Sequence, residues 1–420
     1  MTPRAERIVV TGLGIVSPIG TGAETAWARA LAGTSSCAPI RAFDASEHLV
    51  RIACEVTDFD PTDHMDAREA RRLDPVVRFA LAASREAVRE ADLADGAVDP
   101  DRFGVIIGSG IGGLHTLEAG FEALYRLGPK RVSPMTSAMM IPDMAAGYVA
   151  IALDARGPNF CVVSACATGA HAIGEAAEVL RRGDADVMVA GAAEAGITPL
   201  GIAAFHRTGA MSTRNDDPAR ACRPFDRHRD GFVMGEGAGI VVLETEAHAA
   251  RRGARVLAEL AGYGATADAH HITAPREDGA GAVRAMRIAL AKARAVPEDV
   301  GYVNAHGTGT VQNDAAEARA LAAVFGEGLA RLPVSSTKGM HGHCMGAAGG
   351  IEAVLCALAL QHGVLPPTIN YEVPDPECPL DVVPNAARSV AEPLELVLSN
   401  SFGFGGHNAC LAFRAPPADA

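Results

Sequence analysis

Apolar segments rich in β-branched residues alternate with Ala-rich segments of helical periodicity along almost the whole chain. A strand that is apolar throughout is buried on both faces, which happens when helices cover both sides of its sheet. The alternation therefore predicts an α/β fold. We predict strands at 7–14, 103–110, 161–165, 186–192, 239–244, 302–307, 334–338 and 395–403, and helices at 76–92, 168–182, 279–294, 314–325 and 348–361.

The two halves of the chain follow the same plan. In each half a strand ends in a turn of small residues, and an Ala- and Gly-rich helix follows: VVSACATGAHAIGEA (162–176) in the first half and SSTKGMHGHCMGAAGGIEA (335–353) in the second. The 420 residues suffice for two to three domains or for one large fold of two related halves. Because no low-complexity linker divides the chain, we predict an internal duplication, with one half at 1–253 and the other at 254–420.

Composition and charge narrow the classes of partner. The formal net charge of -13 argues against non-specific binding to nucleic acid, which requires a basic surface. An acidic partner would need a local basic patch. Two short segments, DAREARRLD and GPKRVS, could supply one, although such residues also occur on solvated helix faces. The candidate patch residues are Arg68, Arg71, Arg72, Lys130 and Arg131.

No apolar run of about 18 residues is free of charges and glycine breaks, so the sequence predicts no membrane span. The N-terminal segment MTPRAERIVVTGLG lacks the pattern of a signal peptide, and we therefore expect a cytoplasmic protein. The nine cysteines are scattered and form no CxxC pair, so neither a disulfide framework nor a zinc ribbon is predicted.

Cys166 lies where an apolar strand is predicted to stop and a helical pattern begins. At a helix N-terminus, unpaired N–H groups and the positive end of the dipole stabilise a thiolate. Small neighbours, namely Ala165, Ala167 and Gly169, would let a substrate reach the sulfur. The segment therefore fits a nucleophile, but a buried structural cysteine is the commoner use of such a residue, and this segment alone does not separate the two.

Two histidines occupy similar turns in the second half. NAHGTGT places His306 after an apolar strand, and KGMHGHCMGAAGG places His343 between small residues, five positions after Lys338. Because α/β folds build their sites at the carboxyl ends of strands, we expect Cys166 and both histidines to belong to one site.

A metal site at His341, His343 and Cys344 is the alternative interpretation of the second turn. The flanking residues are small, and no carboxylate or CxxC pair accompanies these three side chains. Metal ligation is therefore disfavoured.

GSGIGG (108–113) satisfies the GxGxxG pattern of a dinucleotide-binding turn, because it follows a predicted strand and precedes a helical pattern. A dinucleotide-binding turn also needs an acidic residue about 20 positions further on, at the end of a second strand, to bind the ribose. Glu122 is too close to the turn for this role, and no other acidic residue at that distance ends a predicted strand. Glycines at such a turn equally permit close packing beside a narrow pocket. An NAD-dependent oxidoreductase is therefore the weak rival function of a different class.

Five segments together resemble one family: VVSACATGAHAIGEA, RPFDRHRDGFVMGEGAG, NAHGTGT, SSTKGMHGHCMGAAGGIEA and NSFGFGGHNACLAF. Their order and spacing are similar to those of the β-ketoacyl-[acyl carrier protein] synthases, over nearly the whole chain. The set of Cys166, His306 and His343 resembles the elongating type II enzymes, since initiating synthases use Cys-His-Asn and chain-length factors lack the cysteine. The resemblance implies a thiolase-like fold of two pseudo-symmetric halves in five αβαβα layers, and a homodimer.

The resemblance also implies catalytic roles. Cys166 would receive an acyl chain from acyl carrier protein as a thioester, and malonyl-carrier protein would then lose CO2 and attack that thioester in a Claisen condensation. His306 and His343 would hold the enolate oxygen, while the backbone N–H groups of Cys166 and Phe404 would hold the second oxyanion. Phe404 would also gate the acyl pocket.

Supporting positions follow from the same resemblance, although turn chemistry alone would also explain the two threonines among them. They are Lys338 with Glu352 or Glu317 as its carboxylate, Thr308 and Thr310 on the pantetheine arm, Ile111 in the acyl pocket, and His271 near the site.

No cofactor of its own is expected, because the phosphopantetheine arrives on the acyl carrier protein. Primary fatty-acid elongation is the first expectation. Departures from the common pattern, in the Met-rich segment 135–140 and at His341, Cys344 and Met345, leave open a polyketide or polyene pathway. A heterodimer with a chain-length factor belongs to that alternative.

Overall fold

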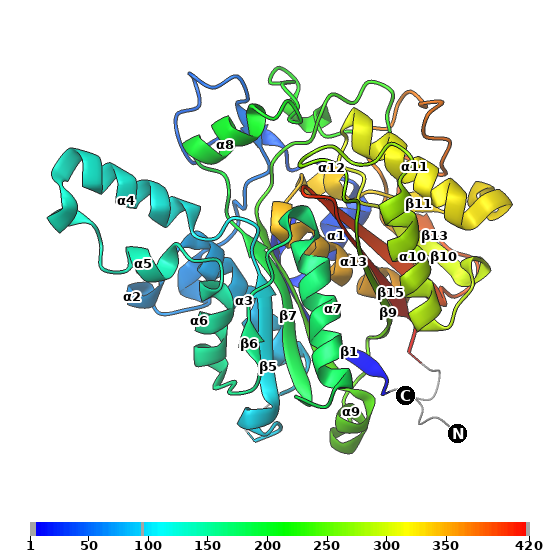
Figure 1. The fold of residues 1–420 in the computed structure, drawn as a ribbon, viewed down its shortest axis with the longest axis horizontal. Helices are drawn as coiled ribbons and strands as arrows, with labels where there is room; N and C mark the ends of the chain where they lie inside the picture. Colours follow the sequence, from blue (N-terminus) through cyan, green and yellow to red (C-terminus); the bar gives the residue numbers. More distant parts are fainter. Residues whose placement is uncertain (1–5, 94–95, 417–420) are drawn as a thin grey trace.

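One sheet of 11 strands runs through the molecule (Figure 1). The structure, a computed structural model, describes residues 6–93 and 96–416. The strands of this sheet are β1 (Ile8–Ser17), β2 (Gly20–Thr21), β5 (Phe103–Gly108), β6 (Asn159–Phe160), β7 (Val187–Glu194), β8 (Gly237–Thr245), β9 (Ala258–Ala267), β10 (Val300–Asn304), β11 (Val334–Ser335), β14 (Leu396–Gly403) and β15 (His407–Arg414). Their order is β11-β10-β14-β15-β9-β1-β8-β7-β5-β6, with β2 paired to β1.

The sheet repeats one strand pattern on either side of its middle. In the first half β6, β5 and β7 are parallel, and β8 and β1 follow antiparallel. In the second half β11, β10 and β14 are parallel, and β15 and β9 follow antiparallel. A short antiparallel pairing of β1 with β9 joins the halves. We propose 1–253 and 254–420 as the two halves, because residue 253 lies between α9 (Glu246–Arg252) and β9.

Helices cover the outer faces of both halves of the sheet, and two further helices lie between the halves (Figure 1). In the first half α3 (Pro75–Glu90) and α6 (Met144–Leu153) pack on the outer face. In the second half α10 (Ala280–Ala293) packs on the outer face, with α11 (Val311–Phe325) beside it. Between the two halves lie α7 (Thr168–Arg181) and α13 (Ala348–His362), within one continuous apolar core. This is the predicted five-layered arrangement, in which strands such as β1, β5, β7 and β8 are buried along their whole length.

Local sequence explains where several helices begin. The Asp74 side chain accepts a hydrogen bond from the N–H of Val76, and Pro75 takes the first position of α3. Thr310 caps α11 in the same way. By contrast, no side chain in the described part of the protein caps α7. The N-terminus of this helix directly follows the turn that contains Cys166.

The segment Met345–His362 is long and apolar enough to cross a membrane by length and composition alone. It contains α13, and 89% of it is buried inside the protein. Its apolar surface is therefore covered by the two halves of the molecule, as in the core helix of a large fold.

Two strand predictions were wrong at the turns that matter most. Residues 161–165 are not a strand, since the neighbouring strand β6 ends at Phe160. The chain turns instead, because the N–H of Ser164 donates to the hydroxyl of Thr168 and the N–H of Ala167 donates to the carbonyl of Ser164. The strand predicted at 334–338 ends as β11, and Lys338 opens the short helix α12 (Lys338–His341). In both places the backbone hydrogen bonds close a turn instead of extending the sheet.

Besides the two-residue strand β2, two long strands of the sheet, β9 and β15, were not predicted. Their sequences, AELAGYGATA and HNACLAFR, contain few β-branched residues. Their pairing is decided by neighbouring strands and by burial, which override a weak local preference.

Candidate active site

The predicted nucleophile and both histidines line one cavity of about 300 Å³. Cys166 comes from the turn η4 (Ala165–Ala167) of the first half, and His306 from the segment after β10. His343 follows α12, and Phe404 follows β14. Both halves of the chain therefore contribute to the site, as the sequence predicted.

The turn before α7 presents Cys166 to the cavity. Ala165 adopts a left-handed backbone conformation with φ of 50°, which is rare for a residue other than glycine. The side chain of Cys166 is buried, and burial raises the pKa of its thiol to about 11. The charge of Lys338 and the backbone N–H groups of Phe404 and Cys166 act in the opposite direction but do not outweigh burial. Burial therefore opposes the stabilisation of a thiolate that the helix N-terminus was expected to provide, and favours the neutral thiol.

His306 and His343 face each other across the cavity. Their ring centroids are 5.3 Å apart and their planes are inclined at 84°. Phe232 packs edge-on against His343, and Phe402 packs against His306. Burial, followed by the charge of Lys338, holds the pKa of both imidazoles well below the usual value, so both rings are neutral. A neutral imidazole has one N–H donor and one acceptor nitrogen, so each ring can donate a hydrogen bond to an oxyanion.

Lys338 pairs with Glu352, and both side chains are fully buried. This contact decides between the two carboxylates that the sequence left open. Neither residue lines the cavity, so Lys338 affects the site through its charge. Burial raises the pKa of Glu352 to about 7, against the charge of Lys338.

Glu317 holds the turn that carries His306. Its carboxylate accepts hydrogen bonds from the backbone N–H groups of His306 at 2.9 Å and Gly307 at 2.7 Å. Asn400 donates to the same carboxylate at 3.2 Å. Of the two glutamates chosen from the sequence, Glu317 therefore lines the cavity, whereas Glu352 lies behind it, paired with Lys338.

Thr308 and Thr310 line the cavity, and their hydroxyl oxygens are 3.0 Å apart. Behind them, Asp314 accepts a hydrogen bond from the N–H of Gly309 at 3.2 Å. The guanidinium of Arg229 donates to the carbonyl of Thr310 at 3.2 Å. The threonine turn is therefore fixed from its buried side, and both hydroxyls also accept backbone hydrogen bonds, Thr308 from Thr310 and Thr310 from Asn313.

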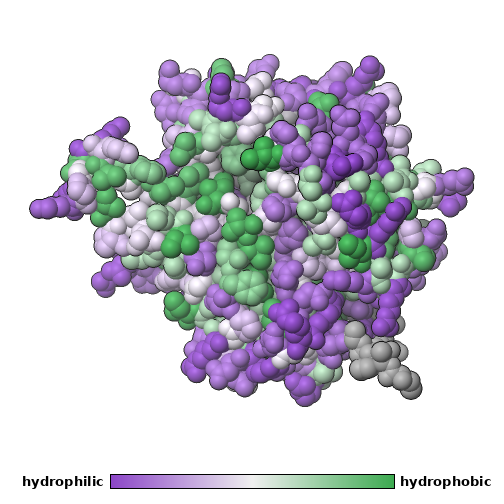
Figure 2. All heavy atoms as spheres, in the orientation of Figure 1, coloured by the Kyte–Doolittle hydropathy of each residue, from purple (hydrophilic) through white to green (hydrophobic). Residues whose placement is uncertain are grey.

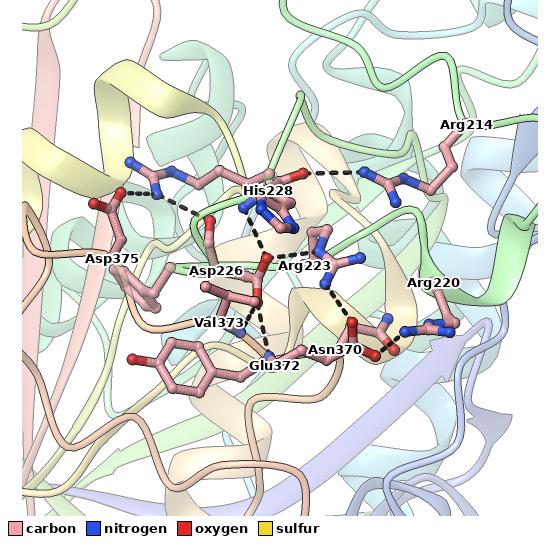
Figure 3. Close-up of polar contacts among 12 residues, drawn as sticks. Arg214, Arg220, Arg223, Asp226, His228, Asn370, Glu372, Val373 and Asp375 are labelled. Atoms are coloured by element: carbon pink, nitrogen blue, oxygen red, sulfur yellow. Dashed lines mark hydrogen bonds and ion pairs between the residues drawn. The ribbon is translucent and has the colours of Figure 1, made fainter.

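A buried polar network extends from this turn and was not predicted from the sequence (Figure 3). Asp226 accepts hydrogen bonds from Arg223 and from the backbone N–H groups of His228, Glu372 and Val373. It thereby ties the RPFDRHRDG segment to the loop after residue 370. The only sequence signal was the density of charges in that segment.

Two of the predicted supporting residues lie outside the cavity wall. Ile111 is not among the lining residues, and its Cδ1 lies 3.2 Å from where a Cβ on Gly196 would be. His271 is exposed, and its Nδ1 accepts hydrogen bonds from the N–H groups of Thr273 and Ala274. Both of those residues line the cavity, so His271 supports its rim.

The structure brings part of the candidate basic patch together. Arg71, Arg72 and Arg131 line one surface depression of about 430 Å³. Arg68 and Lys130 are exposed but do not line it.

The alternative of a metal at His341, His343 and Cys344 finds no support. Within residues 6–93 and 96–416, no group of three His, Cys, Asp or Glu side chains is arranged to hold a metal ion. His341 and Cys344 are fully buried and turned toward each other, with Nδ1 and Sγ 3.8 Å apart.

The glycine turn 108–113 does not present free N–H groups to a dinucleotide. The backbone N–H groups of Gly110 and Ile111 donate to the carboxylate of Glu194, at 2.8 Å and 3.2 Å. An internal anion thus occupies the place that a pyrophosphate would need. Glu194 was not predicted, although a single acidic residue ending the apolar run VMVAGAAE was a visible signal.

Two sequence profiles cover most of the chain. The profile described as Beta-ketoacyl synthase, N-terminal domain, matches residues 5–249, and the one described as Beta-ketoacyl synthase, C-terminal domain, matches residues 257–372. The chain belongs to the β-ketoacyl synthase family. The predicted family is therefore confirmed, and the synthase is an acyltransferase rather than an oxidoreductase.

Curated relatives and solved structures agree with this assignment. The synthase is 50% identical over 409 residues to 3-oxoacyl-[acyl-carrier-protein] synthase 2 of Staphylococcus aureus strain COL, covering 97% of this chain and 98% of the relative. The Synechocystis protein of the same name is 49% identical over 409 residues, with the same coverage. A β-ketoacyl synthase from Burkholderia phymatum superposes with a TM-score of 0.90 at 35% identity, covering 98% of this chain and all of that one.

Ketosynthases of polyketide systems are also similar in structure. A type II polyketide ketosynthase in complex with its acyl-carrier protein has a TM-score of 0.91 at 35% identity, and the ishigamide ketosynthase/chain length factor has 0.92 at 36%. Each match covers 98% of this synthase and 100% of the other chain. The thiolase-like fold is confirmed by these ketosynthase structures.

Proposed function

We propose that this synthase elongates fatty acyl chains by decarboxylative Claisen condensation of an acyl thioester on Cys166 with malonyl-[acyl carrier protein]. The observation that carries the proposal is the meeting of Cys166, His306 and His343 in one cavity. The 50% identity to named 3-oxoacyl-[acyl-carrier-protein] synthases supports this reaction. The products are β-ketoacyl-[acyl carrier protein], CO2 and free carrier protein.

The first half-reaction is acyl transfer to the thiol. The Sγ of Cys166 attacks the acyl thioester of the carrier, the new C–S bond forms, and the bond to the pantetheine sulfur breaks. The Cys166 proton ends on the departing pantetheine thiol. Because Cys166 is a buried thiol, its proton must leave as attack proceeds and pass to the sulfur of the departing pantetheine.

The second half-reaction forms the carbon–carbon bond. Malonyl carrier loses CO2, and its thioester oxygen takes up the negative charge of the enolate. His306 and His343 donate hydrogen bonds to this oxygen. The nucleophilic carbon attacks the thioester on Cys166, and the carbonyl oxygen becomes an oxyanion. We propose that the backbone N–H groups of Cys166 and Phe404, which both lower the pKa of the Cys166 thiol, hold this oxyanion. Collapse of the intermediate releases the β-ketoacyl chain on its carrier and breaks the bond to Cys166, whose thiolate then takes a proton from water to restore the thiol.

Acyl carrier protein is the proposed partner, and it brings the phosphopantetheine, so the synthase needs no cofactor of its own. Thr308 and Thr310 offer hydroxyls to the pantetheine arm. Arg71, Arg72 and Arg131 offer positive charge to an acidic carrier surface. We propose the cytoplasm as the location, since the one long apolar helix of the described chain is a buried core helix.

A homodimer is the proposed assembly. Strand β6 lies at the edge of the sheet, with an exposed Phe160 and, beyond it, an exposed Val163. Figure 2 shows apolar side chains gathered over the face that carries α6 and α4 (Leu114–Leu127). Pairing of β6 with its copy would extend the sheet and cover this face. Light scattering would distinguish the homodimer from a monomer that awaits a chain-length factor.

A polyketide ketosynthase is the second candidate, because solved polyketide ketosynthases share the fold at 35% and 36% identity. The two functions differ in their product. A fatty-acid synthase releases the β-ketoacyl carrier after one condensation, whereas a polyketide enzyme repeats the step without reduction. Mass spectrometry of the carrier-bound products separates them.

The decisive experiment combines thiol labelling with CO2 release. Acyl carrier is expected to acylate Cys166 selectively and to protect it from alkylation by iodoacetamide. His306→Ala should lower CO2 release from malonyl carrier by roughly 100-fold or more, because an enolate donor is lost. Acylation of Cys166 should survive that substitution. If acyl carrier modifies none of the nine cysteines in preference to the others, the proposed function is wrong.

A further inference from the structure

Glu194 connects segments from both halves of the synthase. It is the last residue of β7, and its side chain is fully buried. The carboxylate accepts four hydrogen bonds: from the hydroxyl of Ser109 at 2.7 Å and from the backbone N–H groups of Gly110, Ile111 and Gly346 at 2.8 Å, 3.2 Å and 3.0 Å. Three donors belong to the glycine turn of the first half and one to the turn after His343.

These turns touch each other around the carboxylate of Glu194. A Cβ on Gly110 would lie only 2.8 Å from the Oε2 of Glu194, and 3.6 Å, an ordinary contact distance, from both the carbonyl oxygen of Ala165 and the nitrogen of Gly346. A Cβ on Gly346 would lie only 2.6 Å from the nitrogen of Gly110. The glycine turn, the nucleophile turn and the turn after His343 therefore meet at one point, and the carboxylate of Glu194 holds two of the three together.

The residues next to these contacts lie in, or at the edge of, the apolar cluster that contains Cys166. Met345 precedes Gly346 and lines the cavity. It belongs to the apolar cluster that contains Cys166, Ile197 and Met234. Ile111 follows Gly110, and its side chain lies against Gly196 at the edge of the same cluster. An acyl chain on Cys166 would have this cluster as its apolar surroundings.

We propose that Glu194 is a positioning residue that sets the spacing between Ile111 and Met345, and thereby the length of acyl chain that the synthase accepts. The inference rests on the proposed function, because it concerns the acyl chain held on Cys166. It also explains why the glycine turn is needed: its N–H groups must approach an internal carboxylate closely.

A carboxylate is required because four donors converge on its two oxygens. Ser109 and Ile111 donate to Oε1, and Gly110 and Gly346 donate to Oε2. Glutamine has the same size but only one acceptor atom, so two of the donors would face its amide N–H groups instead. Glu194→Gln therefore keeps the volume of the side chain and weakens the contact between the glycine turn and the turn after His343. Glu194→Asp keeps the charge but shortens the side chain.

The experiment compares acyl carriers with short, medium and long saturated chains. We expect Glu194→Gln to change the ratio of kcat/KM between long and short chains by tenfold or more, and Glu194→Asp to change it less. CO2 release from malonyl carrier requires no acyl chain and serves as the internal reference. A variant in which all chain lengths and CO2 release fall by one common factor would overturn the inference, as would an unchanged chain-length profile.

Glu86→Gln is the matched control. Glu86 lies on α3 and also accepts backbone N–H groups, from Ile15 and Ala23. The Glu86→Gln variant should have a lower free energy of unfolding but an unchanged dependence of kcat/KM on acyl chain length. If Glu194→Gln does not fold, Ser109→Ala removes one donor and should shift the profile in the same direction by less; an unshifted profile then overturns the inference.

The wild-type chain separates the two claims. If it acylates no cysteine from any carrier, the proposed function fails. If it acylates Cys166 and elongates the chain while the Glu194 variants keep its profile, only the role of Glu194 fails.

Discussion

At the scale of single residues, the protonation state of Cys166 illustrates a competition between two effects. The N-terminus of α7 favours a thiolate, while removal from water favours the neutral thiol. Burial prevails and raises the pKa to about 11, so roughly one sulfur in ten thousand is ionised at pH 7.

This pKa predicts how Cys166 reacts with a small electrophile. The thiolate is the reactive form, so the rate of alkylation by iodoacetamide should rise about tenfold per pH unit from pH 7 to pH 10, without a plateau. The rate is measured by mass spectrometry of the peptide that contains Cys166. A plateau below pH 8 would contradict the prediction, because it would show that the helix terminus outweighs burial.

At the scale of elements, the start of α7 meets the start of α13 backbone against backbone. A Cβ on Gly169 would lie 2.5 Å from the nitrogen of Gly350, and a Cβ on Gly349 would lie 2.7 Å from the nitrogen of Ala170. These two helices follow directly from the turns that carry Cys166 and Met345. Their close approach is therefore what brings the two halves of the site together.

Gly169→Ala should force the two helices apart. We expect a loss of about 1–3 kcal/mol in the free energy of unfolding, because the added methyl meets backbone that cannot move aside easily. The thermal midpoint should fall, and kcat should fall with it. Gly147→Ala is the control, since Gly147 lies in α6 with no atom within 4 Å of the added Cβ. That variant should be as stable as the wild type or slightly more stable.

At the scale of the whole molecule, a net charge of -13 should repel an acidic partner unless a local positive surface binds it. The depression lined by Arg71, Arg72 and Arg131 offers a local solution. Because long-range attraction between exposed charges is screened by salt, carrier binding through this depression should depend on ionic strength.

Reversal of Arg71 and Arg72 to Glu should raise the KM for acyl carrier by about tenfold at low salt. The KM for a short acyl-pantetheine thioester, which lacks the protein, should not change. Reversal of both Arg156 and Arg182 to Glu is the charge-matched control, since each is an exposed arginine paired with an aspartate outside the depression. Equal effects of both reversals would contradict docking at the depression.

The sequence by itself determined the class of fold and the main residues of the site. Helices α3, α7, α10, α11 and α13 lie within a few residues of their predicted bounds, because helical periodicity is a local property. Cys166, His306 and His343 were found because each stands in a turn of small residues after an apolar segment, and the structure places all three at one cavity.

Only the tertiary structure decided what depends on contacts between distant parts of the chain. Strands β9 and β15 are rich in small residues, and their neighbours select them. Glu352, not Glu317, pairs with Lys338, and the GSGIGG turn binds Glu194, about 85 residues away. The neutral thiol of Cys166 has the same origin, since burial is produced by residues from both halves. Local sequence specifies elements, whereas burial and pairing through space specify the chemistry of the side chains that those elements carry.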